Sequence, residues 1–127
     1  MKSKKLEIKA DKRGQLIEVF KLPNVGQIFY SSTEQGAMRG NHYHIRKSEF
    51  FCVIDGEAKI MQRNLITNEI EEKNVSGENP EVVEIKPNWV HNVKNIGVNK
   101  MKLLVFVNEI FNPDDSDTFP ADVQCVK

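Results

Sequence analysis

The feature that most constrains the fold is a succession of short β-branched and aromatic runs, divided by turn residues about every ten positions. No window of a dozen residues has convincing helical periodicity. This spacing is typical of a sandwich or barrel. We expect strands at 6–9, 16–20, 26–31, 37–43, 50–54, 57–63, 70–74, 81–85, 91–95 and 101–109. So many strands in 127 residues need covered edges, which predicts an all-β single domain, closed or nearly closed.

Three local patterns refine this prediction. Asp55-Gly56 lies between apolar runs and predicts a tight hairpin, because both residues tolerate positive φ. The run 103–107 is apolar throughout, as in a strand buried on both faces. The tail 112–118 carries a proline and three aspartates and is expected to be a loop, after which Phe119 and Val123 return to the body.

Charge and cysteine usage limit the function classes. The chain has 18 basic and 18 acidic side chains. This balance argues against a nucleic-acid or membrane-surface binder, which would carry a basic excess. The N-terminus has no apolar run of the kind a secretory signal needs, and the run 103–107 is too short to span a bilayer. Cys52 and Cys125 form no CxxC pair, so we expect reduced thiols in a cytoplasmic protein.

The three histidines of the chain carry the main functional signal. His42 and His44 are two positions apart on one expected strand and therefore point to the same face. Glu49 starts the next expected strand, and His91 opens a later one. Three imidazoles and a carboxylate that converge inside a barrel would make a metal site of the zinc, iron, manganese or nickel type.

The spacing of these residues resembles that of the cupin superfamily. Residues 40–56, which hold the two histidines, Glu49 and Gly56, are similar to the first cupin motif. Residues 87–95, with Pro87, His91 and Asn95, are similar to the second, although the usual glycine between the proline and the histidine is absent. The resemblance implies a single cupin domain over 1–127, folded as a double-stranded β-helix (jelly roll).

Three further stretches narrow the family. Residues 27–42 resemble the segment that leads into the Arg-Gly-x-His motif of nucleotide-sugar 3,5-epimerases and 3,4-ketoisomerases. Residues 39–51 and the tail at 113–119 are more similar to the C-terminal cupin domain of capsular-polysaccharide reductases, which act on UDP-2-acetamido-2,6-dideoxy-hexos-4-uloses. The sequence has no GxGxxG of a reductase half, so no redox role is implied.

This resemblance implies an epimerase or isomerase in surface polysaccharide biosynthesis. Its substrate would be a nucleotide-linked 4-keto-6-deoxyhexose, from which a base removes a proton next to the ketone. The implied cofactor is a divalent metal, zinc by relation to the capsular reductase cupins, with iron, manganese or nickel as alternatives. Its implied ligands are His42, His44, Glu49 and His91.

The assignment of the proton-transfer group stays open. Metal-free ketoisomerases use the histidines that match His42 and His44 as acid and base, whereas a metal-bound imidazole has no lone pair for that task. With metal bound, Tyr30, Tyr43 or Glu109 would take the role, or one histidine would stay outside the metal shell. Tyr30 is preferred, because Tyr43 alternates with the histidines and should face away.

Three residues are candidates for substrate binding. Arg39 would hold the diphosphate, since its planar fork suits phosphate oxygens. Gln27 matches a substrate-contacting position of the epimerases, and Trp89 could stack on the base or the sugar.

Two other functions are compatible with the same residues. The same ligands would also serve a metal-dependent dioxygenase or another small-molecule cupin enzyme, and a non-catalytic sugar-binding cupin is the third reading. The expected partner is a nucleotide-linked sugar, without nucleic acid or membrane. A homodimer through the first strands, 6–20, is the expected assembly.

Overall fold

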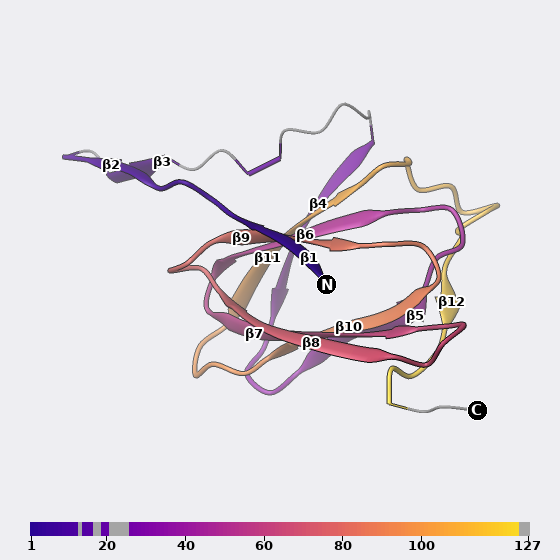
Figure 1. Cartoon of the computed structure of the whole chain (residues 1–127). Coiled ribbons are helices and arrows are strands. Elements are labelled where there is room, and N and C mark those ends of the chain that lie inside the picture. The colour runs from indigo at the N-terminus through magenta and orange to yellow at the C-terminus, as the bar shows by residue number, and fades with distance from the viewer. Residues whose placement is uncertain (13, 17–18, 21–25, 125–127) are drawn as a thin grey trace.

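The computed structural model describes residues 1–12, 14–16, 19–20 and 26–124, and the regular elements in these ranges are strands. Figure 1 shows them as two facing layers. The strands are β1 (Lys2–Lys5), β2 (Lys9–Asp11), β3 (Gly14–Leu16), β4 (Gln27–Thr33), β5 (Met38–Tyr43), β6 (Glu49–Asp55), β7 (Glu57–Asn64), β8 (Ile70–Ser76), β9 (Glu81–Ile85), β10 (Trp89–Asn95), β11 (Met101–Val107) and β12 (Phe119–Pro120). The expectation of an all-β fold is confirmed.

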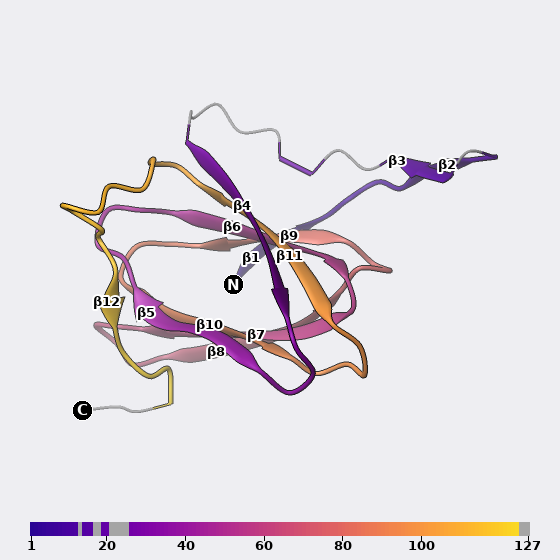
Figure 2. The same ribbon diagram turned by 180° about the vertical axis from the view of Figure 1, so that it is seen from behind.

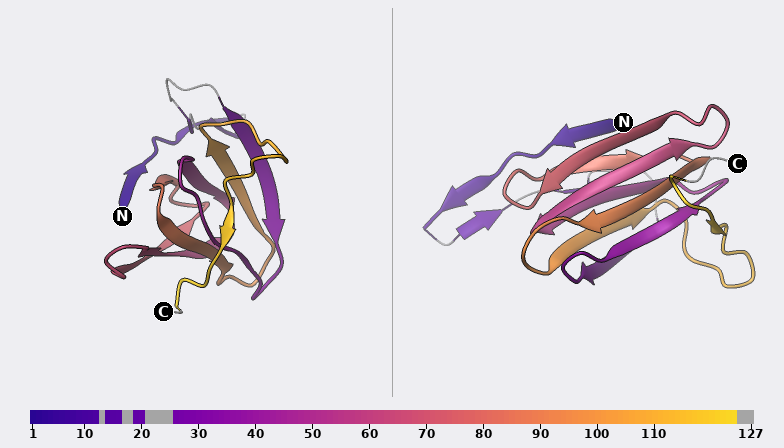
Figure 3. Two further views of the ribbon diagram at one scale, coloured as in Figure 1. Left: turned by 90° about the vertical axis from the view of Figure 1, so that its right-hand side faces the viewer. Right: turned by 90° about the horizontal axis from the view of Figure 1, so that it is seen from below.

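The chain alternates between two antiparallel five-stranded sheets. One sheet has the order β1-β9-β6-β11-β4 and the other β12-β5-β10-β7-β8. The connections β4–β5, β6–β7, β8–β9 and β10–β11 each cross from one sheet to the other, which is the topology of a jelly roll. Figure 2 shows the two sheets from behind, and the left view of Figure 3 looks along the space that they enclose.

The core lies between the inner faces of the two sheets. It is built from alternate residues of the central strands, as the two-residue period of a strand requires. Val83 and Ile85 of β9 face Ala58 and Ile60 of β7, and each is 1% exposed or less. On β11, Leu103, Val105 and Val107 point inward, whereas Phe106 lies on the outer face and is covered there by Phe20 and Phe50. The apolar run 103–107 is therefore packed on both faces, as expected, apart from a partly exposed Leu104.

Asp55-Gly56 does not close a hairpin, so that prediction was wrong. β6 pairs with β9 and β11, whereas β7 pairs with β10 and β8. Gly56 does adopt a positive φ of 89°, as the local sequence indicated. A Cβ there would lie 3.1 Å from the Cα of Met101. The tight turn is thus real, but it passes the chain from one sheet to the other, so that the apolar side chains of β6 and β7 enter one core from opposite sheets.

The first strands differ from those expected. Residues 6–8 are not in a strand, and Lys9 begins β2 instead. The lysine-rich segment Lys2–Lys5 pairs with β9 instead, and Lys5 Nζ lies 2.9 Å from Glu81 Oε1. Of the expected strand 16–20, Leu16 lies in β3, residues 17–18 fall outside the described part, and 19–20 are not in a strand. β2 and β3 form a hairpin that projects from the barrel (Figures 1 and 3).

The C-terminal tail is more ordered than a simple loop. Residues 112–118 are irregular as expected, but Phe119–Pro120 pairs with β5 as β12. Phe119 stacks on Tyr43 at 5.3 Å between ring centroids, and Val123 is fully buried. Arg63 holds this segment by donating to the carbonyls of Asp122 and Val123, both at 2.9 Å. The tail therefore covers the outer face of the second sheet.

Two observations bear on the remaining sequence expectations. No helix in the described ranges is long and apolar enough to cross a membrane. Cys52 is a buried free thiol, and burial raises its pKa to about 11. Cys125 lies outside the described residues.

Candidate metal and proton-transfer site

The four predicted ligands converge inside the barrel. His42 is the last residue but one of β5, and His44 follows that strand directly. Glu49 is the first residue of β6, and His91 lies near the start of β10. One donor atom from each lies within 4.8 Å of all the others. His42 lies 4.7 Å from His91 and 5.0 Å from His44, measured between ring centroids. The sequence prediction that these four residues share one site is therefore matched by their positions.

A bulge in β5 brings the strand close enough to β10 for this convergence. Gly40 and Asn41 have φ values of 101° and 57°, and the register between β5 and β10 shifts at this point. A Cβ on Gly40 would lie 2.8 Å from the carbonyl oxygen of His91, which is closer than such atoms can approach. The glycine before the His-x-His pair thus lets His42 lie directly opposite His91.

Backbone carbonyls set the tautomers of two of the three rings. Nδ1 of His44 lies 2.7 Å from the carbonyl oxygen of Asp117, and Nδ1 of His91 lies 3.0 Å from that of Trp89. A carbonyl can only accept, so both Nδ1 atoms carry hydrogen. In the neutral rings, the Nε2 lone pairs then point at the same carboxylate oxygen, Glu49 Oε1, at 2.6 and 3.1 Å. A proton or a cation is needed where these lone pairs meet.

This donor set fits a divalent metal. His91 Nε2 is buried and has no hydrogen-bond partner in the described structure, because its 3.1 Å contact with Glu49 lacks hydrogen-bond geometry. An orphaned buried nitrogen beside a carboxylate and two further imidazoles is the chemistry that zinc and related ions use. The Nδ1–H bonds to carbonyls are the outer support that metal-bound histidines usually have.

Burial and neighbouring charges shift the pKa values of His42, His44 and Glu49 in different directions. Burial, followed by repulsion from His91, lowers the pKa of His42 to about 4. Burial also opposes ionisation of Glu49, but the hydrogen bond from His44 and the close contact with His91 outweigh it and hold the pKa of Glu49 well below its usual value. For His44, burial is likewise outweighed, by the hydrogen bond to Glu49, and its pKa is raised. At neutral pH, His42 is therefore a neutral base beside an ionised carboxylate.

The three predicted substrate-binding residues lie on three different strands, β4, β5 and β10. Gln27, Val107 and Glu49 occupy one row across three neighbouring strands, so Gln27 faces the interior about 10 Å from the cluster. Trp89 shares the face of His91 on β10. Arg39 is exposed on β5, where its guanidinium bonds Thr33 Oγ1 at 3.1 Å and Ser32 O at 2.7 Å.

The alternative proton-transfer residues lie elsewhere. Tyr30 pairs with Leu104 on the outer face of its sheet and is 59% exposed, so its position gives its predicted role no support. Tyr43 points away from the histidines and stacks on Phe119, as the alternation indicated. Glu109 is exposed and pairs with Arg46.

Asp117 is a site residue that sequence reasoning did not single out. It is 3% exposed, and its carbonyl accepts the Nδ1–H of His44 from 73 positions away. Only its place in the tail that resembles the capsular enzymes could have drawn attention to it.

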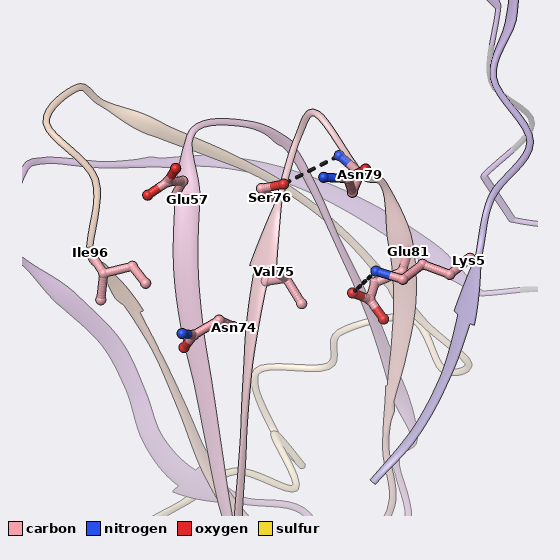
Figure 4. A pocket seen from close by; sticks show the side chains of 8 residues that line it. All are labelled: Lys5, Glu57, Asn74, Val75, Ser76, Asn79, Glu81 and Ile96. Atoms are coloured by element: carbon pink, nitrogen blue, oxygen red, sulfur yellow. Dashed lines mark hydrogen bonds and ion pairs between the residues drawn. The ribbon is translucent and has the colours of Figure 1, made fainter.

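A separate polar cavity lies away from the histidines (Figure 4). It is open to solvent, has a volume of about 350 Å³ and is lined by residues of β1, β7, β8 and β9 and of the turns beside them. Lys5 reaches Glu81 at its wall, and Asn79 N donates to Ser76 Oγ nearby. None of its lining residues belongs to the group of His42, His44, Glu49 and His91.

Comparison with known proteins gives the relationship of this chain. Residues 9–119 match the polysaccharide biosynthesis C-terminal domain family. A UDP-2-acetamido-2,6-beta-L-arabino-hexul-4-ose reductase of Pseudomonas aeruginosa is 36% identical over 114 residues, covering 90% of this chain and 31% of the reductase. The chain thus spans about a third of the length of this curated relative.

Solved structures agree in fold. The capsular polysaccharide assembling protein CapF of Staphylococcus aureus is 37% identical, with a TM-score of 0.76 over 92% of this chain and 34% of CapF. The dTDP-6-deoxy-D-glucose-3,5-epimerase RmlC of Legionella pneumophila, solved with dTDP-4-keto-L-rhamnose, is 18% identical and has a TM-score of 0.77, over 91% of this chain and 69% of RmlC. These matches confirm the cupin jelly roll, and this chain belongs to the polysaccharide biosynthesis C-terminal domain family.

Proposed function

We propose that this chain is an epimerase-like or isomerase-like cupin that acts on a nucleotide-linked 4-keto-6-deoxyhexose in surface polysaccharide biosynthesis. The observation that carries the proposal is a neutral, partly buried His42 beside the Glu49, His44 and His91 donor set. The names of the relatives support the substrate class. The Pseudomonas reductase acts on a hexul-4-ose, and the RmlC structure holds a 4-keto sugar nucleotide.

The proposed chemistry begins with a proton next to the ketone. The lone pair of His42 accepts the proton from C3 or C5, and the C–H electron pair moves into an enolate whose charge rests on the C4 oxygen. Return of a proton to the other face of the same carbon gives an epimer. After abstraction at C3, transfer of the C3-hydroxyl proton to the C4 oxygen and return of the abstracted proton to C4 gives a keto shift instead. A base that is neutral at pH 7 suits this step, which the lowered pKa of His42 provides.

The same arrangement assigns the metal ligands. We propose that His44, Glu49 and His91 hold a divalent ion, zinc first, and that His42 is the histidine left for proton transfer. The two carbonyl-bonded rings are fixed in a ligand tautomer, whereas no hydrogen bond orients the His42 ring in the described structure. When bound, the metal would supply a Lewis acid that stabilises the negative charge on the C4 oxygen. With this assignment, no histidine has to be a metal ligand and the proton-transfer base at the same time.

The proposed substrate contacts follow the positions described above. Gln27 and Trp89 face the interior near the cluster, and Arg39 is available at the exposed part of β5 for the diphosphate. We also propose that residues 1–127 form one cupin domain and that the protein acts in the cytoplasm.

A homodimer is also part of the proposal. The free edge of β1 and the projecting β2–β3 hairpin support an assembly through the N-terminal strands, since exposed edges pair readily. Light scattering of the full chain is the test. A monomer at micromolar concentration would contradict the assembly.

The function is tested by isotope exchange. The purified chain is incubated with UDP- and dTDP-4-keto-6-deoxyhexoses in deuterated water, and incorporation at C3 and C5 is followed by NMR. We expect exchange with one of the two nucleotides, a loss of at least about 100-fold in His42→Gln, and little change in Glu109→Gln. No exchange with either nucleotide, or stoichiometric iron with oxygen uptake, would refute the proposal.

A further inference from the structure

The carboxylate of Asp117 holds the loop that follows His44. Its Oδ1 accepts the backbone N–H of Ile45 at 3.0 Å, and its Oδ2 accepts those of Arg46 and Lys47, both at 2.9 Å. These bonds and burial act on the same group: burial alone would oppose ionisation, but the three donors outweigh it and lower the pKa of Asp117. The side chain is therefore a charged acceptor for three consecutive peptide groups.

The backbone of the same residue holds the ring of His44. The carbonyl oxygen of Asp117 accepts the Nδ1–H at 2.7 Å, which leaves Nε2 directed at Glu49. Asp117 has a φ of 48°, a left-handed conformation that aspartate, asparagine and glycine adopt more readily than other residues. The carboxylate of Asp117 thus binds the backbone after His44, and the carbonyl of the same residue binds the His44 ring.

Other residues near the C-terminus contact the same loop but not the His44 ring. Arg46 pairs with Asp115 and Glu109 at the surface, and Lys47 Nζ donates to Ser116 O at 2.8 Å. Asp115 and Glu109 are exposed, whereas Asp117 is buried and touches the ring itself. The ion pairs of Asp115 and Glu109 therefore hold the loop at the surface, whereas Asp117 orients a side chain of the site.

We infer that Asp117 is a positioning residue, which fixes the His44 ring with Nδ1 protonated and Nε2 aimed at Glu49, and so pre-forms the metal site from the C-terminal tail. The inference rests on the proposed function of the cluster. Outer groups that orient a ligand histidine typically change metal affinity by about 10–100-fold when removed.

The test uses the full chain and three variants. Asp117→Ala removes both carboxylate oxygens and the three hydrogen bonds that they accept. Asp117→Asn favours the left-handed backbone but places an amide nitrogen against one of the donors. Asp115→Ala is the matched control in the same loop. The readouts are Zn²⁺ affinity by competition with a chromophoric chelator and solvent exchange of the His44 Nδ1–H in ¹⁵N-labelled protein.

We expect about 10–100-fold weaker Zn²⁺ binding and at least about tenfold faster Nδ1–H exchange in Asp117→Ala, with a smaller change in Asp117→Asn. Asp115→Ala should match the wild type. Unchanged affinity and exchange in a folded Asp117→Ala would overturn the inference. If Asp117→Ala does not fold, unchanged values in Asp117→Asn would do so. A protected Nδ1–H that depends on Asp117, in a protein that exchanges no sugar proton, would support the inference and refute the epimerase proposal.

Discussion

Replacement of Glu49 by glutamine is the most direct test of the electrostatics of the site. In the metal-free protein, Glu49 Oε1 accepts a 2.6 Å hydrogen bond from His44 Nε2, while its 3.1 Å contact with His91 has no hydrogen-bond geometry. One charged hydrogen bond is therefore lost. Such bonds contribute about 1.5–3 kcal/mol, so Glu49→Gln should lower the free energy of unfolding by that amount.

The penalty should depend on pH in a defined way. The pKa of Glu49 is lowered by folding, so its stabilisation is present above the unfolded value near 4.5 and is lost as the pH falls through the folded value. The pKa of His44 is raised, so its stabilisation is complete below its unfolded value near 6.5 and is lost as the pH rises through the folded value. The penalty of Glu49→Gln should therefore be largest between about pH 5 and 6.5.

The assay is urea denaturation with a chelator present, at several pH values. Glu109→Gln is the control, because that exposed carboxylate pairs with Arg46 at the surface and should change stability by less than about 1 kcal/mol. Equal stability of Glu49→Gln and the wild type between pH 5 and 6.5 would show that Glu49 and His44 do not form a charged pair in the folded protein.

Three further predictions follow from the same geometry. His91→Ala should reduce bound metal to trace levels by elemental analysis while circular dichroism keeps the β spectrum; full occupancy would contradict the ligand assignment. Because folding lowers the pKa of His42 to about 4, the metal-free protein should lose on the order of 1–3 kcal/mol as the pH falls from 6.5 to 4, and His42→Gln should remove most of that slope in urea titrations. Gly40→Ala should cost about 2–4 kcal/mol, since it combines a positive φ with a Cβ 2.8 Å from the His91 carbonyl. Gly36→Ala has a φ of 75° but open space and should cost about 1–2 kcal/mol; equal losses for the two glycines would refute the close approach.

Local periodicity was sufficient to predict the all-β class and the shared face of His42 and His44, whereas Glu49 and His91 joined them as ligands through the resemblance to the cupin motifs. His42 and His44 share a face because side chains alternate along a strand, and that period needs no knowledge of the partner strands. Gly56 was likewise identified as a turn residue from its local sequence, and its φ of 89° agrees.

The pairing of strands could not be read locally. Asp55-Gly56 has the sequence of a hairpin, but β6 and β7 lie in different sheets, where their apolar side chains are buried in the core between the two sheets. At the N-terminus, the lysine-rich β1 pairs through backbone hydrogen bonds and the Lys5–Glu81 ion pair, for which apolar periodicity carries no signal.

The sequence by itself thus predicted the fold class and singled out His42, His44, Glu49 and His91, whose ligand atoms lie together in the structure, while the chemistry of this site stays a prediction. The tertiary structure decided which groups support that site: the outward face of Tyr30, the neutral state of His42 and the return of Asp117 to the ring of His44. The physical reason is that alternation and turn preference act over a few residues, whereas burial and a hydrogen bond between residues 73 positions apart exist only after the two sheets have packed.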